Sequence, residues 1–529
     1  MNDDQPALVI HGHFYQPPRE NPWTGEIETE PSAQPFANWN ERIFQECYRA
    51  NAFAEILDEA GKVLKIVNNY AGLSFNIGPT LFSWLERFHP ETYSKILEAD
   101  HISTQRCGGH GNAIAQSYVH AILPLCSDCD RRTLMRWSIA EFKHRFGRAP
   151  ESLWLPETGC NDDTLGALID EGLKFAILSP SQAAVVKKVP APSPRKLEAP
   201  PSGSPGAPAP GKFPASERQD VSNGKIDSST PYKFLHPDGT GRSIAIFFYN
   251  EVVSKAIAFE GVLISSQALL DRFEAQLGAS GSMVSAAVDG ESFGHHFRYG
   301  ERGLAYALEE DAPKRGFWIT NYAEYLEHHP PEIEVEIKKG PDGKGTAWSC
   351  PHGLGRWYAD CGCQVGGKGG WNQAWRGPLR EALDLLRDKA ALFFQESGLF
   401  ADPWKARDEH IGVILNPKTQ NKFLEEQLKI NSGERERAKA ITHLDLQKNA
   451  LLMYSSCGWF FADIAGLESI LILKFAGRVL DYFDDLGLNS PRKEFLEILA
   501  QAKSNRTEMG NGADIFRRLA KPLRKKAAG

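Results

Sequence analysis

Two acidic residues follow short apolar segments in this chain. Asp289 ends the run Ala286–Val288 and precedes Gly290, and Glu157 follows Trp154-Leu155-Pro156 and precedes Thr158-Gly159. An acid at the end of a buried strand is held on a rigid scaffold while its carboxyl group faces solvent and ligand. Cleavage of a glycosidic bond needs such a pair, and the retaining mechanism requires carboxyl groups about 5–5.5 Å apart. We therefore predict Glu157 and Asp289 as catalytic residues, with Glu291 as a weaker alternative to Asp289.

A second set of polar residues follows another apolar run, Ala7–Ile10. His11 and His13 end this run, and Gln16 comes shortly after. Two interpretations remain open. In the first, the imidazoles and the amide donate hydrogen bonds to sugar hydroxyls. In the second, a divalent metal is bound by His11, His13, Asp289 and one of His295 and His296, as in a metal-dependent hydrolase or deacetylase. His110, in the loop Gly108–Asn112, is a similar but weaker candidate for substrate binding.

Tryptophans and cysteines gather in a glycine-rich stretch further along the chain. Trp348 and Trp357 lie among glycine and polar residues, which suits stacking against sugar rings. Cys350, Cys361 and Cys363 lie near His352. A structural metal is one reading of this group, but we favour reduced cysteines packed beside the tryptophans. Cys126 and Cys129 have no matching second pair, so we assign them no metal.

The segments around these residues predict how they are positioned. Up to residue 376, short β-like runs alternate with amphipathic helical stretches, which indicates an α/β fold with a parallel sheet. Expected strands are 7–10, 73–77, 175–178, 243–248, 283–288 and 316–320, and expected helices include 41–59 and 131–146. The carboxyl ends of barrel strands converge on one mouth, so His11, His13, Glu157 and Asp289 should meet there.

Two further regions differ in composition. Residues 187–230 are rich in Pro, Gly, Ser and Ala, which predicts a disordered insertion within the catalytic domain, residues 1–376. Residues 377–529 are dominated by helical patterns, among them 379–395, 434–461 and 467–485. We expect an all-α C-terminal domain there.

Composition excludes several function classes. The 529 residues carry a net charge of −7, so we expect no nucleic-acid partner. No apolar run approaches the roughly 20 residues of a membrane span, and the first residues lack the pattern of a secretory signal. Nine cysteines in such a chain fit a reducing compartment. We expect a cytoplasmic protein that binds no membrane.

Three motifs resemble glycoside hydrolase family 57. They are His11-Gly12-His13-Phe14-Tyr15-Gln16-Pro17, Trp154-Leu155-Pro156-Glu157-Thr158-Gly159 and Asp289-Gly290-Glu291-Ser292-Phe293-Gly294-His295-His296. The segment Met453–Phe461 is similar to a helical domain of unknown function that accompanies one branch of the family. The loop around His110 departs from the family's second motif, and the Pro-rich insertion is not a family feature.

The resemblance implies an incomplete (β/α)7 barrel followed by an all-α region, acting on α-glucans or maltooligosaccharides without cofactor or metal. It implies that Glu157 is the nucleophile and Asp289 the acid/base of a retaining mechanism. It also implies that His11, His13 and His296 bind the sugar beside the cleaved bond. Hydrolysis, glucanotransfer and branching share one intermediate, and the resemblance does not choose among them.

Overall fold

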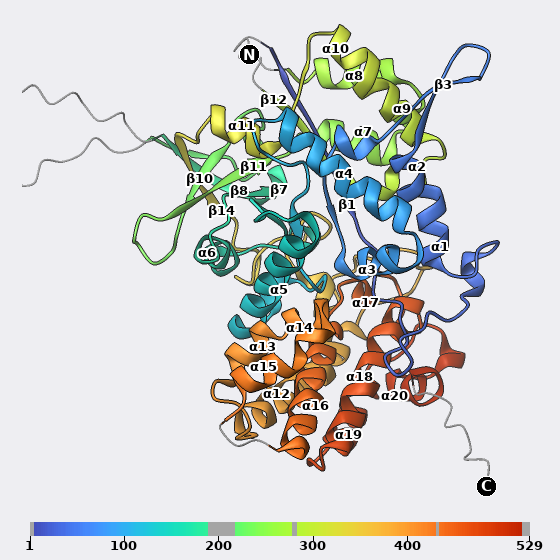
Figure 1. Ribbon diagram of the computed structural model, residues 1–529, viewed down its shortest axis with the longest axis vertical. Helices are drawn as coiled ribbons and strands as arrows, with labels where there is room; N and C mark the ends of the chain where they lie inside the picture. The colour runs from blue at the N-terminus through green and yellow to red at the C-terminus, as the bar shows by residue number, and fades with distance from the viewer. Residues whose placement is uncertain (1–4, 189–216, 278–282, 430–432, 521–529) are drawn as a thin grey trace, which may run out of the picture.

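The computed structural model describes residues 5–188, 217–277, 283–429 and 433–520 (Figure 1). Strand β1 (Ala7–Phe14) lies at the centre of the α/β part and is buried along its whole length. It runs parallel to β12 (Met283–Asp289), and also to β4 (Ser74–Ile77) and β13 (Trp318–Ile319). Burial on both faces is typical of a parallel strand covered by helices. The register places His13 beside Asp289 and beside Asn76.

Further parallel strands continue from β4 around the same core. They are β5 (Ala115–Gln116), β6 (Leu153–Trp154), β7 (Phe175–Leu178) and β11 (Ser243–Phe248). Bridges join Phe75 to Ala113 and Ser152 to Phe175, and ladders join β5 to β6 and β7 to β11. Between β11 and β12 the Asn250 N–H donates to the Ser285 carbonyl, but no ladder forms within the described residues. The fold is therefore mixed α/β as predicted, without a continuous closed sheet in that part of the chain.

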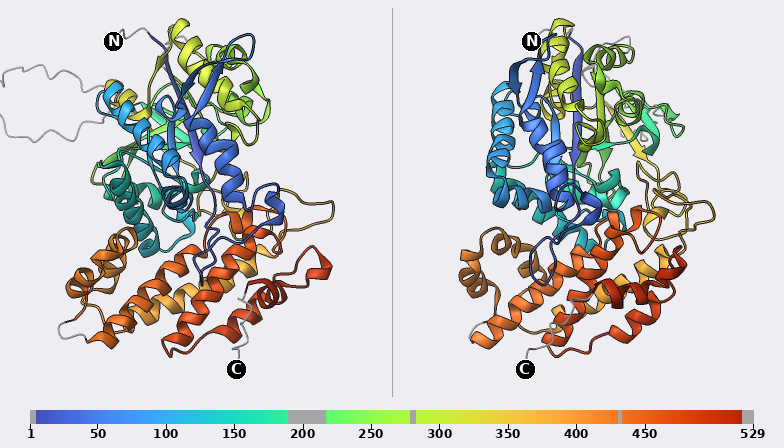
Figure 2. Two further views of the ribbon diagram at one scale, coloured as in Figure 1. Left: turned by 45° about the vertical axis from the view of Figure 1, so that its right-hand side comes forward. Right: turned by 90° about the vertical axis from the view of Figure 1, so that its right-hand side faces the viewer.

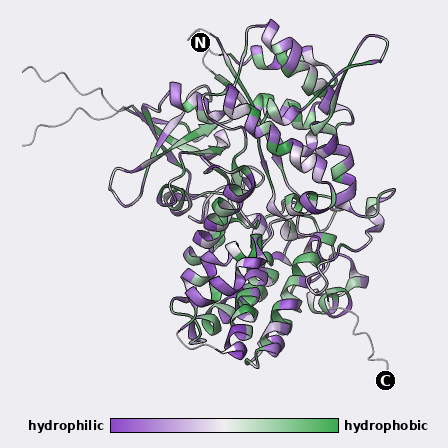
Figure 3. Cartoon of the chain, in the orientation of Figure 1, coloured by the Kyte–Doolittle hydropathy of each residue, from purple (hydrophilic) through white to green (hydrophobic). Residues whose placement is uncertain are grey.

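Helices surround these strands (Figure 2). They are α1 (Trp39–Ile43), α2 (Arg49–Ala52), α3 (Pro79–Phe88), α4 (Pro90–Arg106), α5 (Asp128–Phe146), α6 (Asp162–Asp170), α7 (Glu251–Phe259), α8 (Ser266–Glu274), α9 (Gly300–Tyr306), α10 (Ala312–Lys314) and α11 (Tyr322–His328). Helix α5 shows how the sequence predicts such helix boundaries. Ser127 caps its first turn, and Gly147 ends it in the left-handed conformation. The strands at the centre are largely hydrophobic, whereas the surrounding helices carry hydrophilic residues as well (Figure 3).

The predicted helix 41–59 is too long. Helix α2 ends at Ala52, and the chain continues as the hairpin of β2 (Ala54–Leu57) and β3 (Val63–Val67). Burial alternates along β2, with Ala54 and Ile56 inside. Buried residues therefore recur with a period of two, as in a strand, rather than 3.6, as in a helix. The apolar character of these residues alone did not distinguish a strand from a helix.

A second sheet extends from β7 and β11 and was not expected from the sequence. Its strand order is β7-β11-β10-β14-β8-β9, with β8 (Ala183–Lys188), β9 (Glu217–Asp220), β10 (Tyr232–Leu235) and β14 (Ile333–Ile337). Of the predicted disordered segment 187–230, residues 189–216 lie outside the described residues. The remainder is ordered, because β9 pairs with β8 and the apolar side chains of Val221 and Ile226 are buried.

The C-terminal region is helical, as predicted, and lies below the α/β part in Figure 1. Its helices are α12 (Arg376–Glu396), α13 (Pro403–Glu409), α14 (Ile411–Leu415), α15 (Gln420–Gln427), α16 (Glu434–Leu452), α17 (Cys457–Phe460), α18 (Leu467–Asp485), α19 (Arg492–Leu499) and α20 (Gly512–Ile515). The predicted helix 434–461 is interrupted after Leu452. Across the residues that the structure describes, no helix combines the length and hydrophobicity of a membrane span.

Candidate active site

Glu157 lies in a turn of unusual backbone conformation directly after β6. Its φ is 57° and that of Thr158 is 48°, so two consecutive residues with side chains occupy the left-handed region. Such residues cost of order 1–3 kcal/mol each and persist where surrounding contacts enforce them. Here the Trp348 backbone N–H donates to the Glu157 carbonyl (3.0 Å), and Gln182 Nε2 donates to the Thr158 carbonyl (2.9 Å). The turn is therefore held by two distant segments in the orientation that presents the Glu157 side chain.

The Glu157 carboxylate is partly buried and hydrogen-bonded on one oxygen. Ser349 Oγ donates to its Oε2 at 2.6 Å, and Trp348 Nε1 donates to the same atom at 3.1 Å. Burial raises the pKa of Glu157, while these two donors and the positive charge of Arg356 oppose the rise. Hydrogen bonds to the ionised form favour a carboxylate at this position.

Asp289 ends β12, and solvent reaches its side chain. Protein atoms nevertheless crowd the carboxyl group, and this desolvation raises the pKa of Asp289 to about 8, with further contributions from the negative charges of Glu157 and Glu291. Of the pair, Asp289 is therefore the carboxyl group that favours its protonated form, whereas the hydrogen bonds from Ser349 and Trp348 favour the ionised form of Glu157.

Side-chain contacts connect the two acids into one site. The Trp348 ring, which donates to Glu157, lies edge-on to Trp154 at 5.3 Å, and Trp154 stacks on His13 at 5.1 Å. His13 is paired in register with Asp289. Glu291 completes the acidic group, and its Oε1 accepts a hydrogen bond from Gln16 Nε2 at 2.5 Å. Burial raises the pKa of Glu291, and the bond from Gln16 acts against it.

His11 and His13 belong to a directional hydrogen-bond chain beneath the acids. Ser74 Oγ and Asn76 Oδ1 each lie 2.9 Å from a nitrogen of His11, and Asn76 Nδ2 donates to His13 Nδ1 at 2.8 Å. His13 Nε2 then faces His120 Nε2 at 3.1 Å, and His120 Nδ1 lies 2.6 Å from Ser456 Oγ.

One set of protons satisfies this chain, with all three imidazoles neutral. His11 and His13 carry hydrogen on Nε2, and His120 carries it on Nδ1. Burial supports the neutral forms, because it lowers the pKa of His11 and of His120 to about 3 and that of His13 well below its ordinary value.

This arrangement does not provide the predicted metal ligands. Both nitrogens of His11 and both nitrogens of His13 are engaged within the protein, so neither ring offers a free lone pair beside Asp289. His11 is also fully buried, which corrects its predicted direct contact with a sugar. It acts instead on Asn76, which it helps to orient. His13 is 5% exposed, Gln16 is 7% exposed, and the His296 side chain is 43% exposed.

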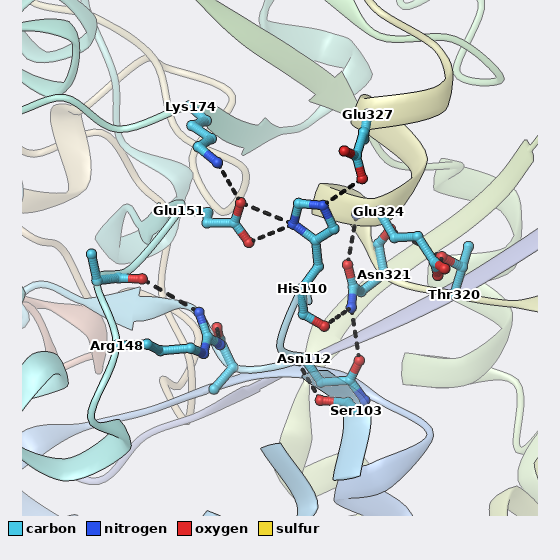
Figure 4. Close-up of polar contacts among 12 residues, drawn as sticks. Ser103, His110, Asn112, Arg148, Glu151, Lys174, Thr320, Asn321, Glu324 and Glu327 are labelled. Atoms are coloured by element: carbon cyan, nitrogen blue, oxygen red, sulfur yellow. Dashed lines mark hydrogen bonds and ion pairs between the residues drawn. The ribbon is translucent and has the colours of Figure 1, made fainter. Parts of the chain in front are cut away.

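Two other predicted residues lie away from the acids. His110 precedes β5 and therefore lies at the opposite, amino end of the strands, where it bridges Glu151 and Glu327 at 2.9 Å each (Figure 4). Partial burial opposes its protonation, but the bonds to both carboxylates raise the pKa of His110. Trp357 is completely buried, so its ring has no face free for stacking on a sugar. Trp348 is half-buried beside Glu157 and keeps that possibility.

Comparison with known proteins identifies the family. Residues 7–338 match the model of "Glycosyl hydrolase family 57". The chain belongs to this family. Residues 371–528 match "Domain of unknown function (DUF3536)". The segment matched to family 57 contains the acids and histidines described above, and the chain is an enzyme of the glycosyl hydrolase class. A comparison with curated proteins finds no match.

Solved structures share the fold of this family 57 protein at low sequence identity. A maltose-forming amylase from Pyrococcus sp. ST04 is 15% identical, with a TM-score of 0.62, over 93% of this chain and 82% of that one. A branching enzyme from Thermococcus kodakaraensis is 14% identical, with a TM-score of 0.50, over 97% and 95%. A 4-α-glucanotransferase from Thermococcus litoralis is 11% identical, with a TM-score of 0.50, over 91% of this chain and 60% of its own.

Several residues of this candidate site were missed by sequence reasoning. Asn76 was detectable, because it stands near the carboxyl end of a predicted strand, as the predicted residues do. Ser349 and His120 lie in irregular segments that carry no periodic signal. The helical region also reaches the site: Tyr15 Oη bonds Ser455 Oγ at 2.6 Å, and the Ser456 N–H donates to the His120 carbonyl at 2.7 Å. The interruption between α16 and α17 creates these contacts.

Proposed function

We propose that this family 57 enzyme cleaves or transfers α-glucan chains with retention of configuration, through a covalent glycosyl-enzyme intermediate. The observation that carries the proposal is the pair of acids with opposed protonation preferences: Glu157 accepts two hydrogen bonds that favour its ionised form, and Asp289 has a pKa of about 8. A retaining mechanism needs one carboxylate nucleophile and one carboxylic acid.

In the first step Glu157 attacks the anomeric carbon while Asp289 donates its proton to the departing glycosidic oxygen. The Asp289 carboxylate then removes a proton from water or from a sugar hydroxyl, which displaces Glu157 and restores both starting states. Ser349 and Trp348 fix the Glu157 carboxylate through one oxygen, so the other oxygen remains free to form the bond. We assign these two side chains a positioning role.

Substrate contacts follow from what stays accessible. We propose that the half-buried Trp348 ring stacks on a sugar and that the exposed His296 contacts the neighbouring sugar, while the buried His13 and Gln16 act as positioning residues. We also infer that β1, β4, β5, β6, β7, β11 and β12 act as an incomplete seven-stranded barrel, because backbone pairings link them in that order. We propose α-glucans as the substrate class because an amylase, a branching enzyme and a glucanotransferase share the fold.

Product analysis tests this proposal. The protein is incubated with amylose, amylopectin and a short maltooligosaccharide, and products are resolved by size and by linkage. Shorter chains indicate hydrolysis, redistributed lengths indicate transfer, and new 1,6 links indicate branching. Glu157→Gln should abolish every one of these activities. Failure of the wild-type protein to act on any of the three glucans, under conditions where its folded state is verified, contradicts the substrate class.

The covalent step has a separate test. A ring-fluorinated α-glucosyl fluoride should label the wild-type protein at Glu157, detected by intact mass and peptide mapping. The ring fluorine slows both chemical steps, whereas the fluoride leaving group speeds only the attachment, so the glycosyl-enzyme accumulates. Products formed from an activated substrate should keep the α configuration when followed by NMR. Inverted product, or label on Glu291, refutes the assigned roles.

A further inference from the structure

The segment that reaches Glu157 also contains a cluster of three cysteines and a histidine. Directly after Ser349 come Cys350 and His352, and the chain then turns back to bring Cys361 and Cys363 beside them. One ligand atom from each residue lies within 4.8 Å of all the others. The sequence favoured reduced cysteines packed beside the tryptophans over a structural metal, and the fold gathers their ligand atoms around one point.

The distances suit a tetrahedral ion. Cys350 Sγ and Cys361 Sγ are 4.0 Å apart, and Cys363 Sγ and His352 Nδ1 are 3.4 Å apart. Zinc bound at about 2.3 Å to sulfur and about 2.0–2.1 Å to nitrogen separates its ligand atoms by about 3.5–3.8 Å. The two printed separations differ from those edges by a few tenths of an ångström. Three cysteines and one histidine are a common closed ligand set of structural zinc.

Glycines allow the two halves of the cluster to approach. Gly353 follows His352 with φ of 70°, and Gly362 separates Cys361 from Cys363 with φ of 76°, conformations that residues with a Cβ rarely adopt. A Cβ on Gly355 would lie 3.1 Å from the Cβ of Cys361. These positions fold the segment so that ligands from both halves point to a common centre.

Buried positive charge beside the cluster is an independent observation. Arg356 is 6% exposed and Arg376 is fully buried, and within the described part of the chain no carboxylate lies within ion-pair distance of either guanidinium. Arg376 Nη1 donates to Cys361 Sγ at 3.7 Å. Two buried cations without anionic partners are costly. Three thiolates around a divalent ion, with a neutral imidazole, carry a net negative charge that offsets them.

We propose that Cys350, His352, Cys361 and Cys363 bind a structural zinc ion. This site is separate from the catalytic acids and does not depend on the proposed reaction. Its consequence for the fold is mechanical. Arg356 Nη2 donates to the Ser349 carbonyl at 3.0 Å, while Arg356 Nη1 and Arg376 Nη2 bond the carbonyl of Phe460 in α17. The ion therefore fixes the segment carrying Ser349 and Trp348 between Glu157 and the helical region.

Metal analysis of the full-length protein tests the proposal. The chain is purified under reducing conditions without added metal or chelator, and zinc and iron are measured by mass spectrometry. We expect about one zinc ion per chain. The double variant Cys361→Ser/Cys363→Ser should hold less than about a tenth of that amount. Cys126→Ser, a half-buried cysteine outside the cluster, should keep all of it.

Cobalt substitution of the wild-type protein keeps the test decisive if the double variant does not fold. Cobalt(II) should give the intense visible absorption of a tetrahedral thiolate site, and X-ray absorption of the zinc form should show three sulfur neighbours at about 2.3 Å. Wild-type protein without zinc, with stoichiometric iron in its place, or with a Cys350–Cys361 disulfide in non-reducing peptide maps overturns the proposal. So does a double variant that retains as much zinc as Cys126→Ser.

Discussion

Replacement of Asp289 by asparagine separates the catalytic from the structural consequences of its raised pKa. The amide keeps the size of the side chain but neither donates an acidic proton nor ionises. General acid–base catalysis contributes about 10²–10⁴-fold, so kcat/KM on unactivated glucan should fall by about that factor. With an α-glucosyl fluoride, whose leaving group needs little protonation, the rate of the first step should fall much less in this variant.

The same variant should be more stable than the wild-type protein at neutral pH. The pKa of Asp289 is raised from 3.8 to about 8 on folding, so between these pH values the unfolded chain is ionised while the folded chain retains a proton. Folding stability therefore falls as pH rises across this window, by up to about 1.4 kcal/mol per pH unit for a fully shielded group. Because solvent reaches Asp289, screening makes the total loss of stability at pH 7 smaller than this slope alone would give.

Urea denaturation of both proteins at pH 4 and pH 7 measures this effect. Asp289→Asn should match the wild-type protein at pH 4 and exceed its free energy of unfolding at pH 7. Glu291→Gln is the matched comparison, since it converts the neighbouring acid to an amide and should lose less activity. A variant that is equally stable relative to wild type at both pH values would show that the carboxyl pKa is unperturbed. Full activity on glucan would falsify the assignment of Asp289 as the acid.

Three other changes test the surroundings of the acids. Ser349→Ala removes a hydrogen bond to the Glu157 carboxylate, worth about 1.5–3 kcal/mol, so kcat/KM should fall about 10–150-fold. The acidic limb of the pH profile should also move to higher pH, and an unchanged limb contradicts the positioning role of Ser349. His110→Gln should cost up to about 1 kcal/mol of stability below pH 6.5 and progressively less as pH rises through the raised folded pKa, seen by comparing melts at pH 5.5 and pH 9. Gly294→Ala places a Cβ 2.1 Å from the Glu46 carbonyl oxygen at φ of 126°, so it should cost more than about 2 kcal/mol by urea denaturation, and a neutral result contradicts the described loop.

Sequence reasoning located the strand ends that carry the two candidate acids because their signal is local. Strands 175–178 and 243–248 have the bounds that their apolar runs predict, and Asp289 ends β12 where that run ends. Side-chain direction was not readable in the same way. Trp357 and Trp348 have similar neighbours in the sequence, yet one ring is fully buried and the other is half-buried beside Glu157. How deeply each tryptophan ring is buried depends on contacts from distant segments.

Ligand clusters and hydrogen-bond chains pose the same difficulty. The cysteines and His352 belong to a loop whose turns are set by positive-φ glycines, and spacing alone does not show that their ligand atoms converge. His120 joins the site only because the fold brings Ser456 and His13 to either side of it. Short-range patterns specify elements, whereas these groups arise from packing among elements.

The interruption between α16 and α17 makes the two regions of the chain hard to separate. Ser455 and Ser456 partner Tyr15 and His120 from the other region. A shortened chain ending near residue 376 would leave both aromatic side chains facing water, where the imidazole could take up a proton and reverse the hydrogen-bond direction that reaches His13. Replacing the helical region with that of a relative should therefore succeed only when the incoming region carries serines at these two positions.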